Sequence, residues 1–218
     1  MSIDRSTSRS IARDLGRGTG DGLGGGSAPA GPSYLVHDTF TDTDGVDLSA
    51  HTPDVDSVGG GWIDDTTAVE IQSNQAAGVG NDASSWIDAG NADVTVEVTR
   101  HTPISNRALR LMGRLTDTSN YIYLNISARG TDASSFRLFR REAGAGTTIA
   151  SGTYTVNISS TYNVKLAMSG SSVSAYLDDG TPLTATETFN QTATKHGLLF
   201  ERNPGANGGY ADDFKVYT

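Results

Sequence analysis

The sequence of 218 residues has no cysteine, only 6 prolines and 3 methionines, and no long apolar run. The absence of cysteine excludes disulfide bridges and thiolate metal sites, so packing alone must hold the fold together. No apolar stretch reaches the roughly 18 residues that a membrane-spanning helix requires, so we expect no membrane insertion. The opening segment MSIDRSTSRS lacks the apolar region of a secretory signal, so we expect no signal-directed secretion.

Basic residues are in the minority. Lysine and arginine number 16 against 25 acidic residues, which gives a formal net charge of -9. An acidic chain is not attracted to the phosphates of nucleic acid, so no nucleic acid partner is expected. Glycine is plentiful, with 26 residues, and threonine and serine fill the spaces between short apolar runs. This composition is typical of β structure with many turns.

The clearest local pattern lies between residues 162 and 180. Val164, Leu166 and Met168 alternate with polar residues, and the alternation resumes after a turn at 169–171. A side-chain period of two predicts a hairpin of two strands, each with one buried face. That buried face requires a second sheet to cover it.

Similar alternation recurs along residues 34–218 and predicts an all-β fold. About eleven or twelve short strands are expected, in a two-sheet antiparallel jelly-roll sandwich. In residues 107–115 the pattern predicts that Leu109, Leu111 and Leu115 point inward, and that Arg110, Met112 and Arg114 point outward. Trp62 follows three glycines, and we interpret it as a buried residue rather than as a platform for a ligand.

Residues 1–33 have a different composition and are predicted to form a separate N-terminal arm. Arginines recur every four residues, which is the spacing of neighbours on a helix, and they predict one short helix at 8–15. A linker rich in glycine follows. The arm is either a disordered tail or a tether that docks into an acidic groove of a partner. For a tether, the contacting residues would be Arg5, Arg9, Ile11, Arg13, Leu15 and Arg17.

Several segments together resemble a known family. They are DTFTDTDG, GGGW, LMGRLTDTSNYIYLNI, YNVKLAMSGSSVSAYLDDG, HGLLF and YADDFKVY. They resemble the concanavalin A-like lectin/glucanase superfamily in its laminin-G-like form, over residues 34–218. The resemblance implies a jelly roll whose first and last strands pair, which would set residues 38–40 beside 213–216.

An arm joined to a lectin-like body also resembles accessory virion proteins of tailed bacteriophages. This resemblance implies a non-enzymatic structural protein, made in the host cytoplasm and located in the virion. Its arm would bind other virion proteins of the capsid or tail, and its body would decorate the particle or adhere to host glycans. The alternative is a free carbohydrate-binding module or an inactive relative of glycoside hydrolases. A homo-oligomer is left open.

No catalytic residues are predicted. Glucanases of the superfamily carry an ExDxxE strand, and the segment that resembles it here is Asp93 to Glu97. These two carboxylates are expected on one strand face, but the first Glu of the motif is missing. A solvated acidic strand face is therefore the better interpretation.

A glycan site is a candidate on the outer strand positions. Aromatic rings stack on sugar rings, while arginine and asparagine bind hydroxyl groups. The candidate residues are Arg110, Arg114, Tyr121, Tyr123, Asn125 and Tyr176. The alternative is that tyrosine and arginine simply suit exposed strand positions.

Structural calcium is the one cofactor that the sequence leaves open. Pairing of the terminal strands could bring carboxylates together, and their hard oxygens favour calcium. The candidate ligands are Asp38, Asp42, Asp44 and Asp213. The alternative is that they belong to ordinary acidic turns.

Overall fold

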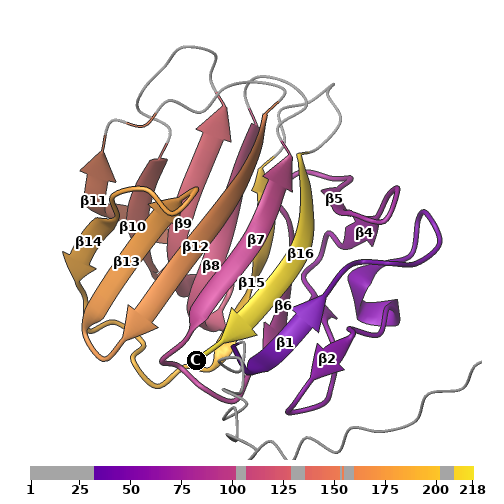
Figure 1. The fold of residues 1–218 in the computed structure, drawn as a ribbon, viewed down its shortest axis with the longest axis horizontal. Coiled ribbons are helices and arrows are strands. Elements are labelled where there is room, and N and C mark those ends of the chain that lie inside the picture. The colour runs from indigo at the N-terminus through magenta and orange to yellow at the C-terminus, as the bar shows by residue number, and fades with distance from the viewer. Residues whose placement is uncertain (1–31, 102–106, 129–135, 153, 155–159, 202–208) are drawn as a thin grey trace, which may run out of the picture. The chain divides into compact units, whose positions relative to one another are not determined.

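The computed structural model describes residues 32–101, 107–128, 136–152, 154, 160–201 and 209–218. In this part of the chain, two antiparallel sheets lie face to face and form the predicted sandwich (Figure 1). The arm residues and the helix predicted at 8–15 lie outside the described residues. The proposed boundary between residues 33 and 34 therefore stays a prediction.

The nine-stranded sheet lies in front in Figure 1 and contains both terminal strands. Its main path is β14 (Leu183–Thr186), β13 (Ser172–Leu177), β12 (Thr161–Ser169), β7 (Thr95–His101), β16 (Tyr210–Tyr217), β1 (Tyr34–Asp38) and β2 (Val55–Asp56). The short strands β4 (Val69–Ile71) and β5 (Ala76–Gly78) join it because β5 pairs with β16. A single turn of 3-10 helix, η1 (Leu48–Ala50), precedes β2.

The seven-stranded sheet lies behind the first in Figure 1 and contains the longest strand, β8. Its order is β11 (Ala145–Gly152), β10 (Phe136–Glu142), β9 (Asn120–Ala128), β8 (Arg107–Asp117), β15 (Lys195–Glu201), β6 (Ala83–Asp88) and β3 (Ile63–Asp64).

The structure confirms the predicted fold class and the hairpin, which is β12 and β13. It also confirms the pairing of the terminal strands, with Asp38 opposite Phe214. Within the described residues, no helix is long and apolar enough to cross a bilayer.

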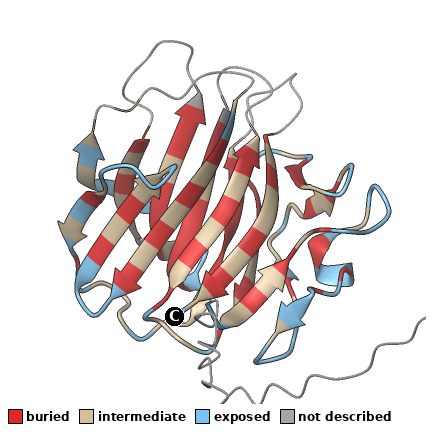
Figure 2. Ribbon diagram, viewed as in Figure 1, coloured by how far each residue is buried: buried red, intermediate tan, exposed pale blue. Residues whose placement is uncertain are grey.

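The core fills the space between the two sheets. Along β7, β12 and β16, buried and partly exposed residues alternate, as the red and tan bands of Figure 2 show. Val96, Leu166 and Phe214 belong to this core, together with Leu111 and Leu124 from the opposite sheet. Trp62 is 2% exposed, so its interpretation as a buried residue is confirmed.

A second, smaller apolar cluster lies on the outer face of the seven-stranded sheet. Leu111 and Leu124 point into the core, so the neighbours Met112 and Tyr123 point to the other face. This outer cluster consists of Met112, Leu115, Tyr121, Tyr123 and Leu199, with Trp86 and Phe139 packed against it.

An irregularity in β8 reverses part of the predicted pattern. The register of β8 against β9 shifts after Gly113, and Arg114 has a φ of 51°. A bulge adds a residue on one strand and so changes the face to which the following side chains point. Leu115 therefore lies in the outer cluster, and Arg114 is fully buried. The predictions that Leu115 points inward and Arg114 outward were both wrong.

Candidate functional site

The outer face of the seven-stranded sheet carries a row of side chains that crosses several strands. Phe139 of β10 pairs with Tyr123 of β9, and Tyr123 pairs with Met112 of β8. The rings of Tyr123 and Phe139 are stacked, with centroids 4.9 Å apart and planes 6° apart. The guanidinium of Arg110 lies 4.9 Å from the centroid of Tyr123, at cation-π distance.

A polar pocket with a volume of about 240 Å³ lies beside this row. Its lining residues come from β8, β9, β10, β15 and β6, the turn between β8 and β9, and the segment after β3. They are Asp65, Asp82, Ser84, Arg110, Met112, Thr118, Ser119, Tyr121, Arg141 and Leu199.

The pocket contains a buried hydroxyl group without a partner. Tyr121 is 1% exposed, and its Oη has no hydrogen-bond partner among the described residues. Buried polar groups are nearly always hydrogen-bonded, to protein or to water. The Tyr121 hydroxyl therefore has a hydrogen-bonding capacity that no group of the described protein uses.

Two arginines lie near the tyrosine rings of this face. The guanidinium of Arg141 lies 5.8 Å from the ring centroid of Tyr121. Arg110 Nη2 donates to Glu201 Oε1, so the charge of Arg110 is balanced. Burial raises the pKa of Tyr123, although the nearby Arg110 opposes the rise. Tyr123 therefore stays a neutral phenol at physiological pH.

Four of the six candidate glycan residues lie together on this face. Arg110 pairs with Asn125 across β8 and β9, and Tyr121 and Tyr123 share the same side of β9. Asn125 is partly exposed and lies outside the lining of the pocket. Their role in binding stays a prediction.

The other two candidates lie elsewhere. Tyr176 lies on β13 in the nine-stranded sheet, so it cannot complete a site with residues of β8 and β9. Arg114 Nη2 donates to Asp93 Oδ1 at 2.8 Å, and its Nε donates to the carbonyl of Ala92 at 3.2 Å. Burial lowers the pKa of Arg114, while the negative charge of Asp93 opposes this effect. Arg114 anchors a connecting segment and is covered from solvent.

Sequence reasoning missed Arg141, Asp65 and Asp82 as pocket residues. Arg141 follows Arg137 and Phe139 at a spacing of two, so the alternation along β10 could have indicated it. Asp65 and Asp82 lie at the ends of β3 and β6, and no local pattern connects them to β9.

The four predicted calcium ligands do not form one group in the structure. Asp38 is buried and accepts hydrogen bonds from Trp62 Nε1 at 2.6 Å and from the Phe40 amide at 2.7 Å. Asp213 instead faces outward, where it contacts His37 Nε2 at 2.9 Å. Adjacent strand residues point to opposite faces, so pairing of the strands does not bring these two carboxylates together.

The other two candidate ligands also have partners within the protein. Asp42 Oδ2 lies 2.9 Å from His51 Nδ1, and Asp44 accepts a hydrogen bond from the Ser73 amide. In the described part of the chain, no three acidic, histidine or cysteine side chains are grouped as a metal site would require. The structure does not bring these four carboxylates together, and calcium binding stays a prediction.

The carboxylates of the glucanase-like segment have separate surroundings. Asp93 precedes β7 rather than lying on it, and it binds Arg114 and the Gly170 amide. Glu97 lies on β7 and accepts hydrogen bonds from Asn163 and from the Tyr217 hydroxyl at 2.6 Å. Both carboxylates are therefore held by hydrogen bonds within the protein.

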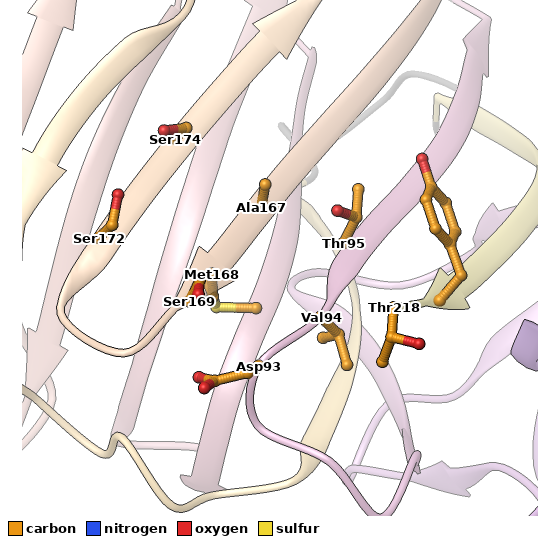
Figure 3. Close-up of a pocket in the computed structure, with 10 residues that line it drawn as sticks. Asp93, Val94, Thr95, Ala167, Met168, Ser169, Ser172, Ser174 and Thr218 are labelled. Carbon is orange, nitrogen blue, oxygen red and sulfur yellow. The ribbon is translucent and has the colours of Figure 1, made fainter. Parts of the chain in front are cut away.

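A second pocket of about 290 Å³ lies on the outer face of the nine-stranded sheet (Figure 3). Many of its lining side chains are small, including Thr95, Ala167 and Ser174. Its larger polar groups, Asp93 and the hydroxyl of Tyr217, are already hydrogen-bonded within the protein. This pocket therefore offers a ligand less polar recognition than the first.

Comparisons with known proteins identify similar folds. No family model matches the sequence, and no curated protein matches it. The structure is similar to the carbohydrate-binding module CBM66 from Bacillus subtilis, with a TM-score of 0.59 and 19% identity over 72% of this chain and 95% of that chain.

Two further solved structures share the fold. Domain 4 of AbnA, a GH43 extracellular arabinanase from Geobacillus stearothermophilus in complex with arabinotriose, has a TM-score of 0.53 and 15% identity over 85% of this chain and 92% of that chain. A Bacillus subtilis protein of unknown function with a galectin-like fold has a TM-score of 0.52 and 16% identity over 72% and 88% of the two chains. These similarities establish the jelly-roll fold.

Proposed function

We propose that residues 34–218 form a non-catalytic carbohydrate-binding module whose site is the polar pocket on the outer face of the seven-stranded sheet. The observation that carries this proposal is the Tyr121 hydroxyl, which is buried in the pocket without a hydrogen-bond partner among the described residues. Aromatic rings, arginine and carboxylates around one cavity are the groups that bind the faces and hydroxyls of sugars.

The fold comparisons support the same class of function. Two of the similar structures are a carbohydrate-binding module and a domain solved with arabinotriose. Fold alone does not determine function, so the polar pocket is the main support for this function.

A hydroxyl deletion provides a direct test. A glycan array first identifies a ligand for the full-length protein, and isothermal titration then compares Tyr121→Phe with the unchanged protein. The Tyr121 hydroxyl has no partner within the described protein, so the variant should keep its stability and lose about two- to tenfold in affinity.

Tyr176→Phe is the matched control because Tyr176 lies on the opposite sheet. Its affinity should not change. Equal affinities for the Tyr121→Phe, Tyr176→Phe and unchanged proteins would contradict the assignment of the pocket, and an array without any bound glycan would contradict the function.

Display of this module on a phage particle is a separate proposal, supported by the sequence of residues 1–33. A free carbohydrate-binding module accounts equally well for the fold. Retention of the full-length protein by purified virions, and its loss in an Arg9→Glu, Arg13→Glu double variant, would favour the particle-bound protein. Equal retention of the unchanged protein and the double variant by virions would favour the free module.

A further inference from the structure

We propose that the pocket selects an acidic sugar, whose carboxylate binds at Arg141 and Tyr121 and whose hydroxyls face Asp65 and Asp82. This inference rests on the proposed carbohydrate-binding function and specifies its ligand class. It follows from the hydrogen-bonding state of the pocket and from the way charge is distributed across it.

The unsatisfied atoms of the pocket residues can all donate a hydrogen bond, and two of the three can only donate. Arg110 Nε, Tyr121 Oη and Arg141 Nε are buried and have no partner among the described residues. Guanidinium nitrogens can only donate, and a carboxylate can only accept. A ligand that satisfies these atoms must therefore present acceptor oxygens, and an ionised carboxylate presents two of them on one carbon.

The two arginines differ in charge balance. Arg110 forms an ion pair with Glu201. No ion pair involves Arg141 within the described residues, and its guanidinium lies over the ring of Tyr121. Arginine suits this role because its planar group binds a carboxylate through two parallel hydrogen bonds.

The pocket has two chemically different ends. In the strand order β10-β9-β8-β15-β6-β3, Arg141 and Tyr121 lie on β10 and β9. Asp65 and Asp82 lie beside β3 and β6, on the far side of β8 and β15. A ligand carboxylate is attracted to the first end and repelled from the second, where carboxylates accept hydrogen bonds from hydroxyl groups. A sugar acid, which carries both groups, fits this polarity in one orientation.

Matched pairs of ligands test the inference. The probes are trisaccharides of glucuronic, galacturonic and mannuronic acid, each compared with the same trisaccharide after reduction of its carboxyl groups to alcohols. Isothermal titration with the full-length protein should show at least one acid bound about tenfold more tightly than its reduced partner. Arg141→Gln should abolish this difference while a residual affinity for the sugar remains.

Arg137→Gln is the control variant because it removes the same charge from the same strand but outside the pocket lining. It should retain the preference for the acid. If Arg137→Gln and Arg141→Gln lose the preference for the acid equally, the proposal is overturned, because such a result indicates a general attraction between charges. Arg141→Lys keeps the charge but lacks the planar group, so it should recover only part of the preference, and full recovery would contradict paired hydrogen bonding. Circular dichroism melts establish that each variant is folded.

The outcomes separate this inference from the proposed function. Equal binding of acid and reduced sugar in every pair, with weaker binding by Tyr121→Phe, would overturn the acidic ligand and leave the carbohydrate site intact. Absence of binding to every sugar on the array would overturn both.

Discussion

Replacement of His51 by leucine is expected to remove a buried imidazolium that two carboxylates share. His51 Nε2 lies 3.0 Å from Asp38 Oδ1, and Nδ1 lies 2.9 Å from Asp42 Oδ2. A neutral imidazole carries only one N–H, so both contacts are donated only by the charged form. Burial by itself lowers the pKa of His51, but the hydrogen bonds to Asp42 and Asp38 oppose it, and the resulting pKa is raised.

The size of the effect follows from the burial of Asp38, whose side chain is 1% exposed. Loss of one partner of a buried ion pair costs about 3–5 kcal/mol because the remaining charge is uncompensated. Trp62 and the Phe40 amide still donate to Asp38 in the variant. The expected loss of unfolding free energy therefore lies at the lower end of that range, at about 3 kcal/mol. This is a large part of a typical domain stability of about 5–15 kcal/mol.

His37→Leu is the matched control because it also removes a histidine that contacts an aspartate. The side chains of His37 and Asp213 are 24% and 37% exposed, so this pair lies at the surface. Its loss should cost about 0.2–1 kcal/mol. Urea unfolding, followed by tryptophan fluorescence, measures both variants.

The loss of stability caused by His51→Leu should be larger at acidic than at alkaline pH. The pKa of His51 is higher in the folded than in the unfolded protein, so protonation of His51 stabilises the fold. This stabilisation is fully present below the unfolded pKa of about 6.5 and is lost as pH rises through the folded pKa. The difference between the unchanged protein and the variant should therefore be largest below pH 6.5 and smaller in alkaline buffer. A stability difference that does not change with pH, or one no larger than for His37→Leu, would refute the inference that a charged His51 bridges Asp38 and Asp42.

Three further predictions concern buried groups. Burial lowers the pKa of His196 to about 4, so the fold should lose about 3 kcal/mol as pH falls from the unfolded value of about 6.5 to 4. Urea unfolding of His196→Gln should lack this acid dependence. Gly197→Ala would place a Cβ 2.2 Å from the Ser85 carbonyl oxygen, so its Tm should fall with a cost of about 1–3 kcal/mol. Trp62→Phe removes a hydrogen bond to Asp38 and should cost about 1–3 kcal/mol in urea unfolding, whereas an unchanged stability would contradict the contact.

Periodicity predicted the sheets well because each strand buries one face. Val164, Leu166 and Met168 alternate with polar residues, and this local pattern is enough to indicate β12 and its hairpin. The same rule failed in β8, where the bulge at Gly113 and Arg114 changes the face of the residues that follow. A bulge depends on pairing with a neighbouring strand, and the sequence of one strand does not reveal it.

The sequence predicted only part of the candidate site, because alternation along one strand does not show how that strand pairs with its neighbours. Tyr121, Tyr123 and Arg110 were recognised because outward polar and aromatic residues stand out within an alternating strand. Arg114 was included because the bulge was not foreseen, and Tyr176 because the sequence does not state which sheet contains β13.

The sequence by itself determined that this chain forms a β sandwich, that it contains no disulfide, and that its terminal strands pair, the last through family resemblance. Alternation and composition are local properties, so they can be read along the chain. Only the tertiary structure decided which outward residues share a cavity. Arg141, Tyr121 and Asp65 come from three strand regions that meet through long-range pairing, and no local pattern in the sequence places them around one pocket.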